Sequence, residues 1–373
     1  MVDDATMMQR VLELAEKGIS STHPNPRVGC VIVNDGKIVG EGYHASAGQL
    51  HAEREALRAA GENARGGTAF VNLEPCCHQG RTPPCTDGLI DAGITRVVAA
   101  IADPNPLVEG GGVELLKEAG ISVETGLMQE EALLLNKGFI QRMALKKPWV
   151  ILKSAATLDG RTAAFDGQSK WITGAEARAE GHNLRSKCSA ILTGIGTVIA
   201  DDPLMNVRVG VPDTTIRQPI RVVLDSKLQI PLEAKIIGDE PNLLVFTLSN
   251  DLNKIAQLSE LGVEVIQQQD NTSTKIDLNG VLDELVKWEC NEVLVEAGQE
   301  LSGAFVAAGL VDELILFYAG SLLGDQGKSM FKFDASLPFA DRFEYKIKKV
   351  SMLGDDFKVN AINEDSLKKL LEN

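Results

Sequence analysis

The tripeptide His51-Ala52-Glu53, with Pro75-Cys76 and Pro84-Cys85 downstream, decides how the first part of this sequence folds. It is expected to open a helix that runs to about residue 60, and the two cysteines are expected after a strand. One imidazole and two thiolates provide three ligands of a tetrahedral zinc ion, and an open fourth position is the condition for a catalytic zinc with bound water. Residues two apart on a helix point about 200° from each other. We therefore predict that His51, Cys76 and Cys85 bind the metal, whereas Glu53 approaches the water as a proton shuttle.

This pattern is typical of zinc-dependent deaminases, with one departure. In such enzymes a carboxylate takes a proton from the water and later delivers it to a leaving amine. About two residues usually separate the cysteines, whereas eight lie between Cys76 and Cys85. The inserted run 77–84 contains prolines and a glycine, and we expect it to form one wall of a substrate pocket.

Simpler interpretations compete for several of these side chains. The alternative to a metal site is that His51 faces solvent and the cysteines are buried apolar residues. Cys77 is interpreted as a bystander, because joint chelation by neighbouring cysteines is strained, and Cys30 as part of the core. For His44, which follows a predicted hairpin, the sequence is compatible both with a place in the pocket and with a structural role in a loop.

Composition and charge define the class of protein. With 373 residues, 44% of them hydrophobic, the chain is long enough for two globular domains. Its 37 Lys and Arg against 52 Asp and Glu give a net charge of -15, which argues against nucleic-acid binding. No run approaches the roughly 20 apolar residues of a membrane helix, and the acidic N-terminus does not resemble a signal peptide. Six unevenly spaced cysteines fit a reducing cytoplasm. We expect a soluble, cytoplasmic protein without nucleic-acid or membrane partners.

Strand-like and helix-like segments alternate along the whole chain, which predicts an α/β fold. A hairpin is expected over 28–39 and a single long helix near 129–145. Lys147-Pro148 closes that helix, because proline cannot continue its hydrogen bonds. We therefore expect domains over 1–146 and 147–364, followed by a polar tail over 365–373 that is compatible with a frayed helix. Further strands are expected at 68–73, 96–101, 121–124, 149–154, 189–193, 220–225, 243–247, 263–266, 292–296 and 314–319.

The second domain carries weaker signals of dinucleotide binding. Gly194 and Gly196 follow a predicted strand, but the full glycine fingerprint is missing. Glu296-Ala297-Gly298 joins a strand to a helix whose free N–H groups can hold a phosphate, although an ordinary turn has the same form. Asp225 at a strand end favours NAD, while Ser226-Lys227 could accept the phosphate of NADP. The residues alone therefore leave the choice of cofactor open.

Cations and one tryptophan are candidates for ligand contacts in this domain. Lys153, Arg185 and Arg208 could bind a substrate phosphate, the arginines by bidentate hydrogen bonds. Trp171 could stack on an aromatic ring or be a half-buried structural residue. His182 and Arg185 lie three apart on a predicted helix and share a face, which is either functional or simply solvated.

Longer motifs resemble the bifunctional deaminase/reductase family of riboflavin biosynthesis over almost the whole chain. Besides the histidine and cysteine segments above, the motifs of the first half are Pro24-Asn25-Pro26-Arg27-Val28-Gly29, Gly42-Tyr43-His44 and Asp103-Pro104-Asn105-Pro106. Those of the second half are Lys153-Ser154-Ala155, Leu158-Asp159-Gly160-Arg161, Ser169-Lys170-Trp171-Ile172-Thr173, Thr193-Gly194-Ile195-Gly196-Thr197, Asp201-Asp202-Pro203 to Arg208, and Glu296-Ala297-Gly298.

The resemblance implies two activities in sequence. A cytidine-deaminase-like three-layer domain would use Zn²⁺ to deaminate a diaminopyrimidinone that carries a phosphoribosylamino arm. A dihydrofolate-reductase-like domain would then use NADPH to reduce that arm to its ribityl phosphate. The partner would be this phosphorylated pyrimidine, and the enzyme is expected to be a homo-oligomer.

The resemblance also implies roles for individual residues. The zinc ligands would be His51, Cys76 and Cys85, with Glu53 as the catalytic proton donor. Contacts to NADPH would come from Ala155, Trp171, Thr197, Asp201, Ser226, Gly298, Gln299, Glu300, Leu301, Ser302, Gly303 and Ala304. Contacts to substrate would come from Asn25, His44, Lys153, Ser169, Arg185, Met205, Arg208 and Glu296.

Two departures from the family pattern concern the second domain. Ser189 stands where the family often has Asp, and Met205-Asn206 replaces a common Leu-Thr pair.

Rival hypotheses are a nucleic-acid deaminase, which would need a basic channel, and a binding module stabilised by zinc. A fourth His or Cys ligand would favour the latter.

Overall fold

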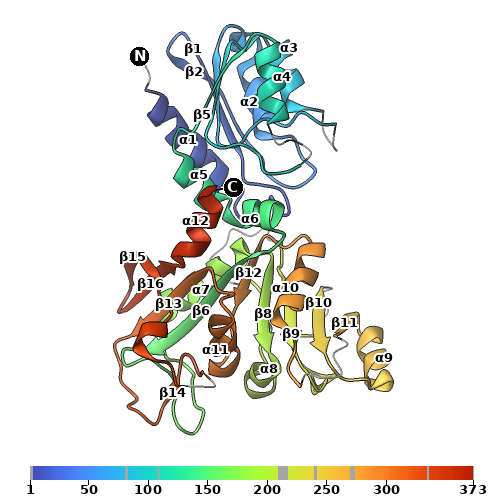
Figure 1. The fold of residues 1–373 in the computed structure, drawn as a ribbon, viewed down its shortest axis with the longest axis vertical. Coiled ribbons are helices and arrows are strands. Elements are labelled where there is room, and N and C mark those ends of the chain that lie inside the picture. Colours follow the sequence, from blue (N-terminus) through green and yellow to red (C-terminus); the bar gives the residue numbers. More distant parts are fainter. Residues whose placement is uncertain are drawn as a thin grey trace. The chain divides into compact units, whose positions relative to one another are not determined.

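The computed structural model describes residues 3–79, 83–106, 108, 110–208, 217–238, 242–268, 274–333 and 336–372. The chain divides into two compact units, one formed by Met1–Lys146 with Lys369–Asn373 and the other by Lys147–Lys368 (Figure 1). Each unit has its own sheet and its own hydrophobic core, as expected of a domain.

The first unit is a mixed sheet between two layers of helices. Its strands and helices are α1 (Asp4–Glu16), β1 (Gly29–Asn34), β2 (Lys37–Tyr43), α2 (Ala52–Ala60), η1 (Gly61–Ala64), β3 (Thr68–Val71), α3 (Cys85–Asp91), β4 (Arg96–Ala99), α4 (Gly111–Glu118), β5 (Ser122–Thr125), α5 (Gln129–Leu135) and α6 (Lys137–Leu145). The strand order is β2-β1-β3-β4-β5, with β1 antiparallel to both neighbours and the other pairs parallel. α2, α3 and α4 cover one face, and α1 and α5 the other (Figure 1). The predicted cytidine-deaminase-like architecture is confirmed.

Close packing of α2 on β2 fixes the amino end of this helix. A Cβ atom at Gly42 would lie 2.4 Å from the carbonyl oxygen of Ala52 and 2.5 Å from the amide nitrogen of Ala56, so no other residue fits there. The backbones of helix and strand are thereby in direct contact. His51 and Glu53, at the start of α2, are held against the sheet as a result.

The prediction of a single helix near 129–145 is wrong, because the segment forms two helices, α5 and α6, that are separated by a break at Asn136. This residue has φ -110° and ψ 17°. Its buried side chain accepts a hydrogen bond from the Arg27 N–H at 2.8 Å and donates one to the Arg27 carbonyl at 2.9 Å. A tertiary contact therefore overrides the local helical pattern.

The second unit is built on a nine-stranded, mostly parallel sheet. Its elements are β6 (Trp149–Thr157), β7 (Arg161–Ala163), α7 (Ala175–Lys187), β8 (Ala190–Gly194), α8 (Ile195–Asp201), β9 (Ile220–Leu224), β10 (Leu243–Thr247), α9 (Leu252–Glu260), β11 (Val263–Gln267), α10 (Leu278–Lys287), β12 (Glu292–Val295), α11 (Gln299–Ala307), β13 (Glu313–Ala319), β14 (Lys328–Ser329), η2 (Phe339–Asp341), β15 (Lys346–Leu353), β16 (Asp356–Ile362) and α12 (Glu364–Glu372). The order is β11-β10-β9-β8-β12-β6-β13-β16-β15, in which the strands from β11 to β13 are parallel. Helices α10 and α11 pack on one face, α8 and α9 on the other. The predicted reductase fold is confirmed.

Two strands near the C-terminal end are absent from the sequence prediction. β15 and β16 form an antiparallel hairpin at one edge of the sheet. β15 is rich in lysine and mostly exposed, so it lacks the alternation of buried and exposed residues by which a strand is recognised. The residues predicted as a polar tail lie largely in α12.

The connections of the second sheet create a site for a ligand. From β8 the chain continues to β9, and from β12 it crosses to β13, so the two connections leave neighbouring strands in opposite directions. Ligands of open α/β sheets bind at such a switch point, beyond the carboxyl ends of the strands. The ends of β8 and β12 are Gly194 and Val295.

Helix lengths bear on the expected absence of membrane spans. The helices α1 and α7 have 13 residues each, fewer than the roughly 20 that cross a bilayer. Within the part of the chain that the structure describes, no helix combines the length and apolar character of a membrane span.

Candidate functional site

Three potential metal ligands converge at the ends of two helices. His51 is the N-cap of α2, Cys85 is the first residue of α3, and Cys76 lies in the loop after β3. The Nδ1 atom of His51 is 3.5 Å from Cys76 Sγ and 3.4 Å from Cys85 Sγ. Because the backbone of His51 is extended, with φ -72° and ψ 160°, the residue lies off the end of the helix. The spacing of His51 and Glu53 requires this position, because two residues that are two apart within a helix point in nearly opposite directions.

These separations fit a zinc ion. With Zn–N near 2.0 Å and Zn–S near 2.3 Å, a tetrahedral site places nitrogen and sulfur ligands about 3.5 Å apart. The ligand atoms of all three residues lie within 4.8 Å of one another. The donor set therefore matches zinc in both chemistry and dimensions.

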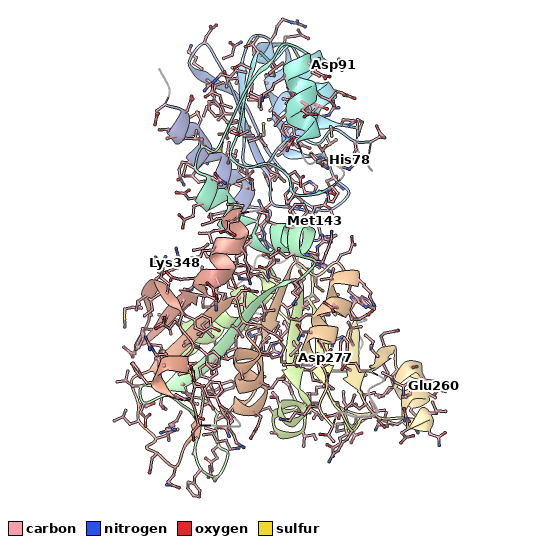
Figure 2. All side chains as sticks on the ribbon, in the orientation of Figure 1. His78, Asp91, Met143, Glu260, Asp277 and Lys348 are labelled. Carbon is pink, nitrogen blue, oxygen red and sulfur yellow. The ribbon has the colours of Figure 1, made fainter. Side chains whose placement is uncertain are left out.

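Among the described residues, no fourth His, Cys, Asp or Glu joins this group. His78, labelled in Figure 2, and Cys77 follow Cys76 directly but are not members of it. Of the predicted pocket wall over 77–84, residues 80–82 lie outside the described residues, and their sequence contains no His or Cys. Since a structural zinc site normally uses four protein ligands, the arrangement favours an open fourth position. Cys30 lies in the hydrophobic core, as predicted.

Glu53 is the carboxylate beside this group. It lies in the first turn of α2, is 4% exposed and interacts with the Cys85 thiol. Burial raises the pKa of Glu53, and the charge on Cys76 adds to the shift, although His51 opposes it. A carboxyl group with a raised pKa can accept and return a proton near neutral pH.

The two cysteines do not ionise alike. Hydrogen bonds from the Cys85 thiol and from His51 lower the pKa of Cys76. The Cys76 thiolate and burial in turn raise the pKa of Cys85. The two thiols are therefore electrostatically coupled, and both would have to lose their protons to bind a metal ion.

His44 and Asn25 lie against the metal group. The His44 ring is edge-on to His51, with 5.4 Å between the ring centroids. Its Nδ1 is 3.0 Å from the Leu50 carbonyl and its Nε2 is 3.0 Å from Asn25 Nδ2. Because a carbonyl oxygen only accepts, Nδ1 carries the proton and Nε2 accepts from Asn25. Of the two interpretations of His44, the structure supports a place beside the metal group.

Asp103 is a residue of this site to which the sequence analysis assigned no role. It is 6% exposed, and its pKa is raised to about 7, first by burial and then by the charges of Glu74, Cys76 and Glu53. Its backbone N–H donates to Glu74 Oε2 at 3.1 Å, which ties Asp103 to the segment that carries Cys76. The only signal in the sequence was its place in the Asp103-Pro104-Asn105-Pro106 motif.

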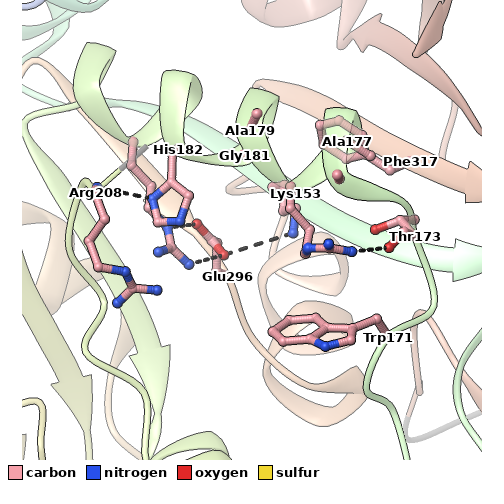
Figure 3. A pocket seen from close by; sticks show the side chains of 13 residues that line it. Lys153, Trp171, Thr173, Ala177, Ala179, Gly181, His182, Arg208, Glu296 and Phe317 are labelled. Atoms are coloured by element: carbon pink, nitrogen blue, oxygen red, sulfur yellow. Dashed lines mark hydrogen bonds and ion pairs between the residues drawn. The ribbon is translucent and has the colours of Figure 1, made fainter. Parts of the chain in front are cut away.

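The second unit has a cavity of about 450 Å³ next to α7 (Figure 3). Five of the predicted ligand contacts line it, namely Lys153, Trp171, Arg185, Arg208 and Glu296. The remaining lining residues are Thr173, Ala175, Ala177, Arg178, Ala179, Gly181, His182 and Phe317. Residues from five separate segments of the chain thus converge on one cavity.

A carboxylate between two cations forms the base of this cavity. Arg185 donates to Glu296 through Nε at 2.6 Å and through Nη2 at 2.9 Å, and Lys153 Nζ lies 3.9 Å from Glu296. Burial opposes ionisation of Glu296, but the charges of Arg185 and Lys153 outweigh it and lower its pKa to about 2. Glu296 therefore stays charged and fixes both cations.

Arg208 is held differently. Its backbone N–H donates to His182 Nδ1 at 3.4 Å, and its guanidinium donates to Asn206 Oδ1 at 2.8 Å. Among the described residues it has no carboxylate partner, so its charge remains available to an anionic ligand. Burial, Arg185 and Arg208 lower the pKa of His182, which keeps this ring neutral between the two cations.

Trp171 forms the rim of the cavity. Its side chain is 73% exposed, and the guanidinium of Arg178 lies 4.8 Å from the ring centroid. Arg178 also donates to the Thr173 carbonyl at 2.6 Å. The indole is thus held on one side and open on the other, where a planar ligand could stack. Sequence reasoning did not find Arg178, because a single arginine on a helix usually faces solvent.

Three of the predicted dinucleotide contacts, Thr197, Ser226 and Gly298, lie at the switch point of the sheet. Gly298 precedes α11, and the space where its Cβ would stand is open. No side chain caps the first N–H groups of α11, and such groups bind phosphate. Thr197 lies in α8 and Ser226 follows β9, so both are at the same edge. These uncapped amides and the open backbone fit a dinucleotide such as NADPH.

Other residues of the predicted cofactor segment point elsewhere. A Cβ at Gly303 would lie 1.9 Å from the Lys332 carbonyl oxygen, so Gly303 is needed for packing. Ser302 is buried and donates to Ala297 O at 3.2 Å, while Gln299 bonds Ser329 and Glu300 pairs with Lys332. The remaining predictions lie outside the cavity, namely Ala155 on β6, Ser169 in the loop before α7, Asp201 beside Lys170, Met205 in a hydrophobic core, and Leu301 and Ala304 in α11.

The structure also shows what Asp225 and Ser189 do, two residues whose roles the sequence left open. Asp225 is fully buried, and its Oδ2 accepts from the Ile230 N–H at 2.7 Å, so it holds a turn and does not select NAD. Ser189, the departure from the family pattern, accepts from the N–H groups of Asn291 and Glu292 at 2.9 and 3.2 Å. It lies at the amino end of β8, opposite to the site.

Comparisons with known families cover both units. Residues 148–359 match the family described as the RibD C-terminal domain. Residues 1–101 match the cytidine and deoxycytidylate deaminase zinc-binding region. The second match includes His51, Glu53, Cys76 and Cys85.

Individual proteins are similar to the whole chain. "Riboflavin biosynthesis protein RibD" of Haemophilus influenzae is 45% identical, with 95% of this chain and 96% of that protein covered. The protein of the same name from Escherichia coli is 44% identical, with 95% and 98% covered. Among solved structures, RibD of Acinetobacter baumannii is 45% identical with a TM-score of 0.89, covering 96% of this chain and 98% of that one. A deaminase/reductase from Thermotoga maritima is 36% identical with a TM-score of 0.83, with 96% and 98% covered.

Proposed function

The chain belongs to the RibD family of bifunctional deaminase/reductases in riboflavin biosynthesis, and from this premise we propose its substrate and the roles of its residues. The first unit removes an amino group from a diaminopyrimidinone that bears a phosphoribosylamino arm. The second unit reduces that arm to the ribityl phosphate with NADPH. The observation that carries this proposal is the group of His51, Cys76 and Cys85 at zinc-ligand separations, with the buried carboxyl of Glu53 beside it.

In the deaminase unit, each residue has a separate task. His51, Cys76 and Cys85 would hold zinc, which when bound would lower the pKa of a water molecule so that hydroxide is available as a nucleophile near neutral pH. Glu53 accepts a proton from the nucleophile and returns it to the leaving amine, for which its raised pKa is suited. The linked side chains of Asn25 and His44 orient the pyrimidine.

In the reductase unit, the cavity binds the phosphorylated arm. NADPH, when bound, supplies the hydride, and the protein orients the two reactants. Glu296 fixes Arg185 and Lys153, so that their donors are placed before substrate enters. Arg208 has an available charge and is proposed to contact the phosphate. Trp171 is proposed to contact the cofactor.

Conversion of the diaminopyrimidinone ribosyl phosphate tests the proposal directly. Mass spectrometry of reactions without NADPH should detect the deaminated product only. With NADPH, a further product two hydrogens heavier should accumulate. Unchanged substrate in both reactions, with zinc-loaded enzyme, would refute the proposal.

Replacement of Arg208 by Ala should raise the KM of the reductase for its phosphorylated substrate by about 10- to 100-fold, the usual worth of a charge-assisted hydrogen bond. The KM for NADPH should stay near the wild-type value. Steady-state kinetics with each ligand varied in turn measures both constants. Arg342, which stacks on Phe339 away from the cavity, provides the control substitution to Ala. Equal changes in both KM values would remove Arg208 from the phosphate site.

We further propose that residues 1–146 and 147–364 are the two catalytic domains and that 365–373 is not required for catalysis. A fragment of residues 147–364 is then expected to bind NADPH. Isothermal titration calorimetry of the fragment and the full chain should give similar affinities. A fragment that folds but does not bind NADPH would contradict this division.

We propose that the enzyme is cytoplasmic and forms homo-oligomers. Disulfides are absent from all six cysteines, each of which the structure describes, and this suits a reducing compartment. The cytoplasm is also where a phosphorylated intermediate and NADPH are available.

Analytical ultracentrifugation measures the oligomeric state, and the proposal of a homo-oligomer predicts a mass above that of one chain.

A further inference from the structure

Two buried polar side chains lie on the segment that leads from β3 to the zinc ligand Cys76. Asn72 is fully buried and Glu74 is 3% exposed. Both stand in the short connection between the end of β3 at Val71 and Cys76. Neither belongs to the metal group, and neither was singled out as a ligand by the motifs.

Asn72 holds the chain that carries Asn25. Its Oδ1 accepts from the Gly29 N–H at 2.8 Å, and its Nδ2 donates to the Arg27 carbonyl at 2.9 Å. Asn136 holds the same Arg27 from the other side through the two bonds described above. The backbone two residues after Asn25 is therefore fixed at both its donor and its acceptor, and Asn25 in turn contacts His44, which packs against His51 of the metal group.

Glu74 holds a second part of the chain, between Asp103 and the start of α4. Its Oε2 accepts from the N–H groups of Asp103 and Gly110, both at 3.1 Å, and its Oε1 accepts from Val113 N–H at 2.9 Å. One carboxylate thus fixes the backbone of Asp103 and the start of α4. Close packing supports the contact, because a Cβ at Gly112 would lie 2.0 Å from the carbonyl oxygen of Pro75.

We propose that Asn72 and Glu74 are positioning residues of the deaminase. Together they tie the segment ending in Cys76 to the two borders of the pyrimidine site, one carrying Asn25 and the other Asp103. A single piece of chain thereby sets the distance of both borders from the metal. This inference rests on the proposed deamination of the pyrimidine.

Isosteric substitutions separate positioning from zinc binding. In Asn72→Asp the donor that meets the Arg27 carbonyl becomes an acceptor, so two oxygens face each other. In Glu74→Gln a donor replaces an acceptor that meets backbone N–H groups. Each change breaks at least one buried hydrogen bond without altering the volume of the side chain. The three proposed zinc ligands, His51, Cys76 and Cys85, are unchanged in both variants.

The matched controls make the same chemical exchange elsewhere. Asn34 lies at the far end of β1 and donates to the carbonyls of Asn63 and Arg65 at 2.9 and 3.0 Å, so Asn34→Asp is the control for Asn72→Asp. Asp277, labelled in Figure 2, accepts from the N–H groups of Asn279 and Gly280 at the start of α10. Asp277→Asn is therefore the control for Glu74→Gln.

The experiment uses the full-length, zinc-loaded enzyme. We expect the KM for the diaminopyrimidinone ribosyl phosphate to rise by about 10- to 100-fold in both test variants, because misplacing substrate-positioning groups by about 1 Å can cost on the order of 100-fold. Zinc content per chain and the rate of the reductase with deaminated substrate should match the controls. A purely structural role would lower the amount of active enzyme, and hence the apparent kcat, at an unchanged KM.

The outcomes are distinct. The inference is overturned if the variants contain as much zinc as the controls and their KM for deamination lies within about twofold of the control value. It is also overturned by loss of zinc with a normal KM in the remaining active fraction. If either variant is insoluble, Asn72→Ser and Glu74→Asp, which shorten the reach of the same side chains, are judged by the same criteria. Failure of the wild type to deaminate this substrate would instead refute the proposed function.

Discussion

Glu53→Gln is expected to abolish deamination while zinc binding and reduction persist. The amide keeps the size of the side chain but cannot accept a proton from water or return one to the leaving amine. General acid–base catalysis of this kind contributes about 10²- to 10⁴-fold. Because Glu53 is not a ligand of the metal group, the loss should appear in kcat for deamination and not in the zinc content.

Release of ammonia and zinc analysis of the same preparation measure this effect. Reduction of the deaminated substrate by the variant provides an internal check on folding. Glu55→Gln is the matched control, since Glu55 lies on the same helix but pairs with Arg58 at the surface. Deamination by Glu53→Gln at more than about a tenth of the wild-type rate would contradict the role assigned to Glu53.

Glu296→Gln is expected to destabilise the reductase unit and to impair reduction. The substitution leaves Arg185 and Lys153 without the carboxylate that they share, at a site where Glu296 is 13% and Arg185 16% exposed. Removing one partner of a buried ion pair costs about 3–5 kcal/mol in the free energy of unfolding. The exposed pair of Glu284 and Lys287 gives the control, for which Glu284→Gln should cost less than about 1 kcal/mol.

Tryptophan fluorescence is suited to this measurement, because Trp149, Trp171 and Trp288, the three tryptophans of the chain, all lie in the second unit. Urea unfolding followed by this signal therefore reports on that unit. Deamination by Glu296→Gln should remain at the wild-type rate. A free energy of unfolding equal to that of the control would mean that the ion pair contributes no stability.

The same comparison has a defined pH dependence. The pKa of Glu296 in the folded protein is about 2, below its ordinary value of 4.5. Its charge therefore stabilises the fold fully above pH 4.5, and this contribution is lost as the pH falls from 4.5 towards 2. The advantage of the wild type over Glu296→Gln should be constant near neutral pH and shrink on acidification. An advantage that grew below pH 4.5 would contradict the assignment.

The fold could be predicted where local signals and tertiary structure agree. The apolar run at β1 and the Pro148 boundary of α6 are examples, since one pattern accounts for both the element and its burial. Prediction failed at Asn136, where a hydrogen bond to a distant backbone breaks a helix. It also failed at β15, whose strand conformation depends on pairing with β16 and not on a buried face.

The residues of the candidate site likewise divide into those that a local pattern predicts and those that depend on tertiary contacts. The metal group could be predicted because its residue types and spacing are restrictive. Arg178 could not, because a single arginine on a helix usually faces solvent and not a neighbouring ring. Asp103 could not, because its hydrogen bond to Glu74 joins two residues that are distant in sequence. Asp225 was given a possible role in reading the ribose, yet the structure uses it to hold a turn.

X-ray absorption at the zinc edge of the full-length, metal-loaded protein tests the central claim most directly. We predict one zinc per chain with two sulfur ligands, one imidazole and one light atom from solvent, at the distances of a tetrahedral site. A shell of four protein ligands, with a third sulfur or a second imidazole, would mean a structural zinc. That result, or the absence of zinc from these side chains, would contradict the assignment of a catalytic metal centre.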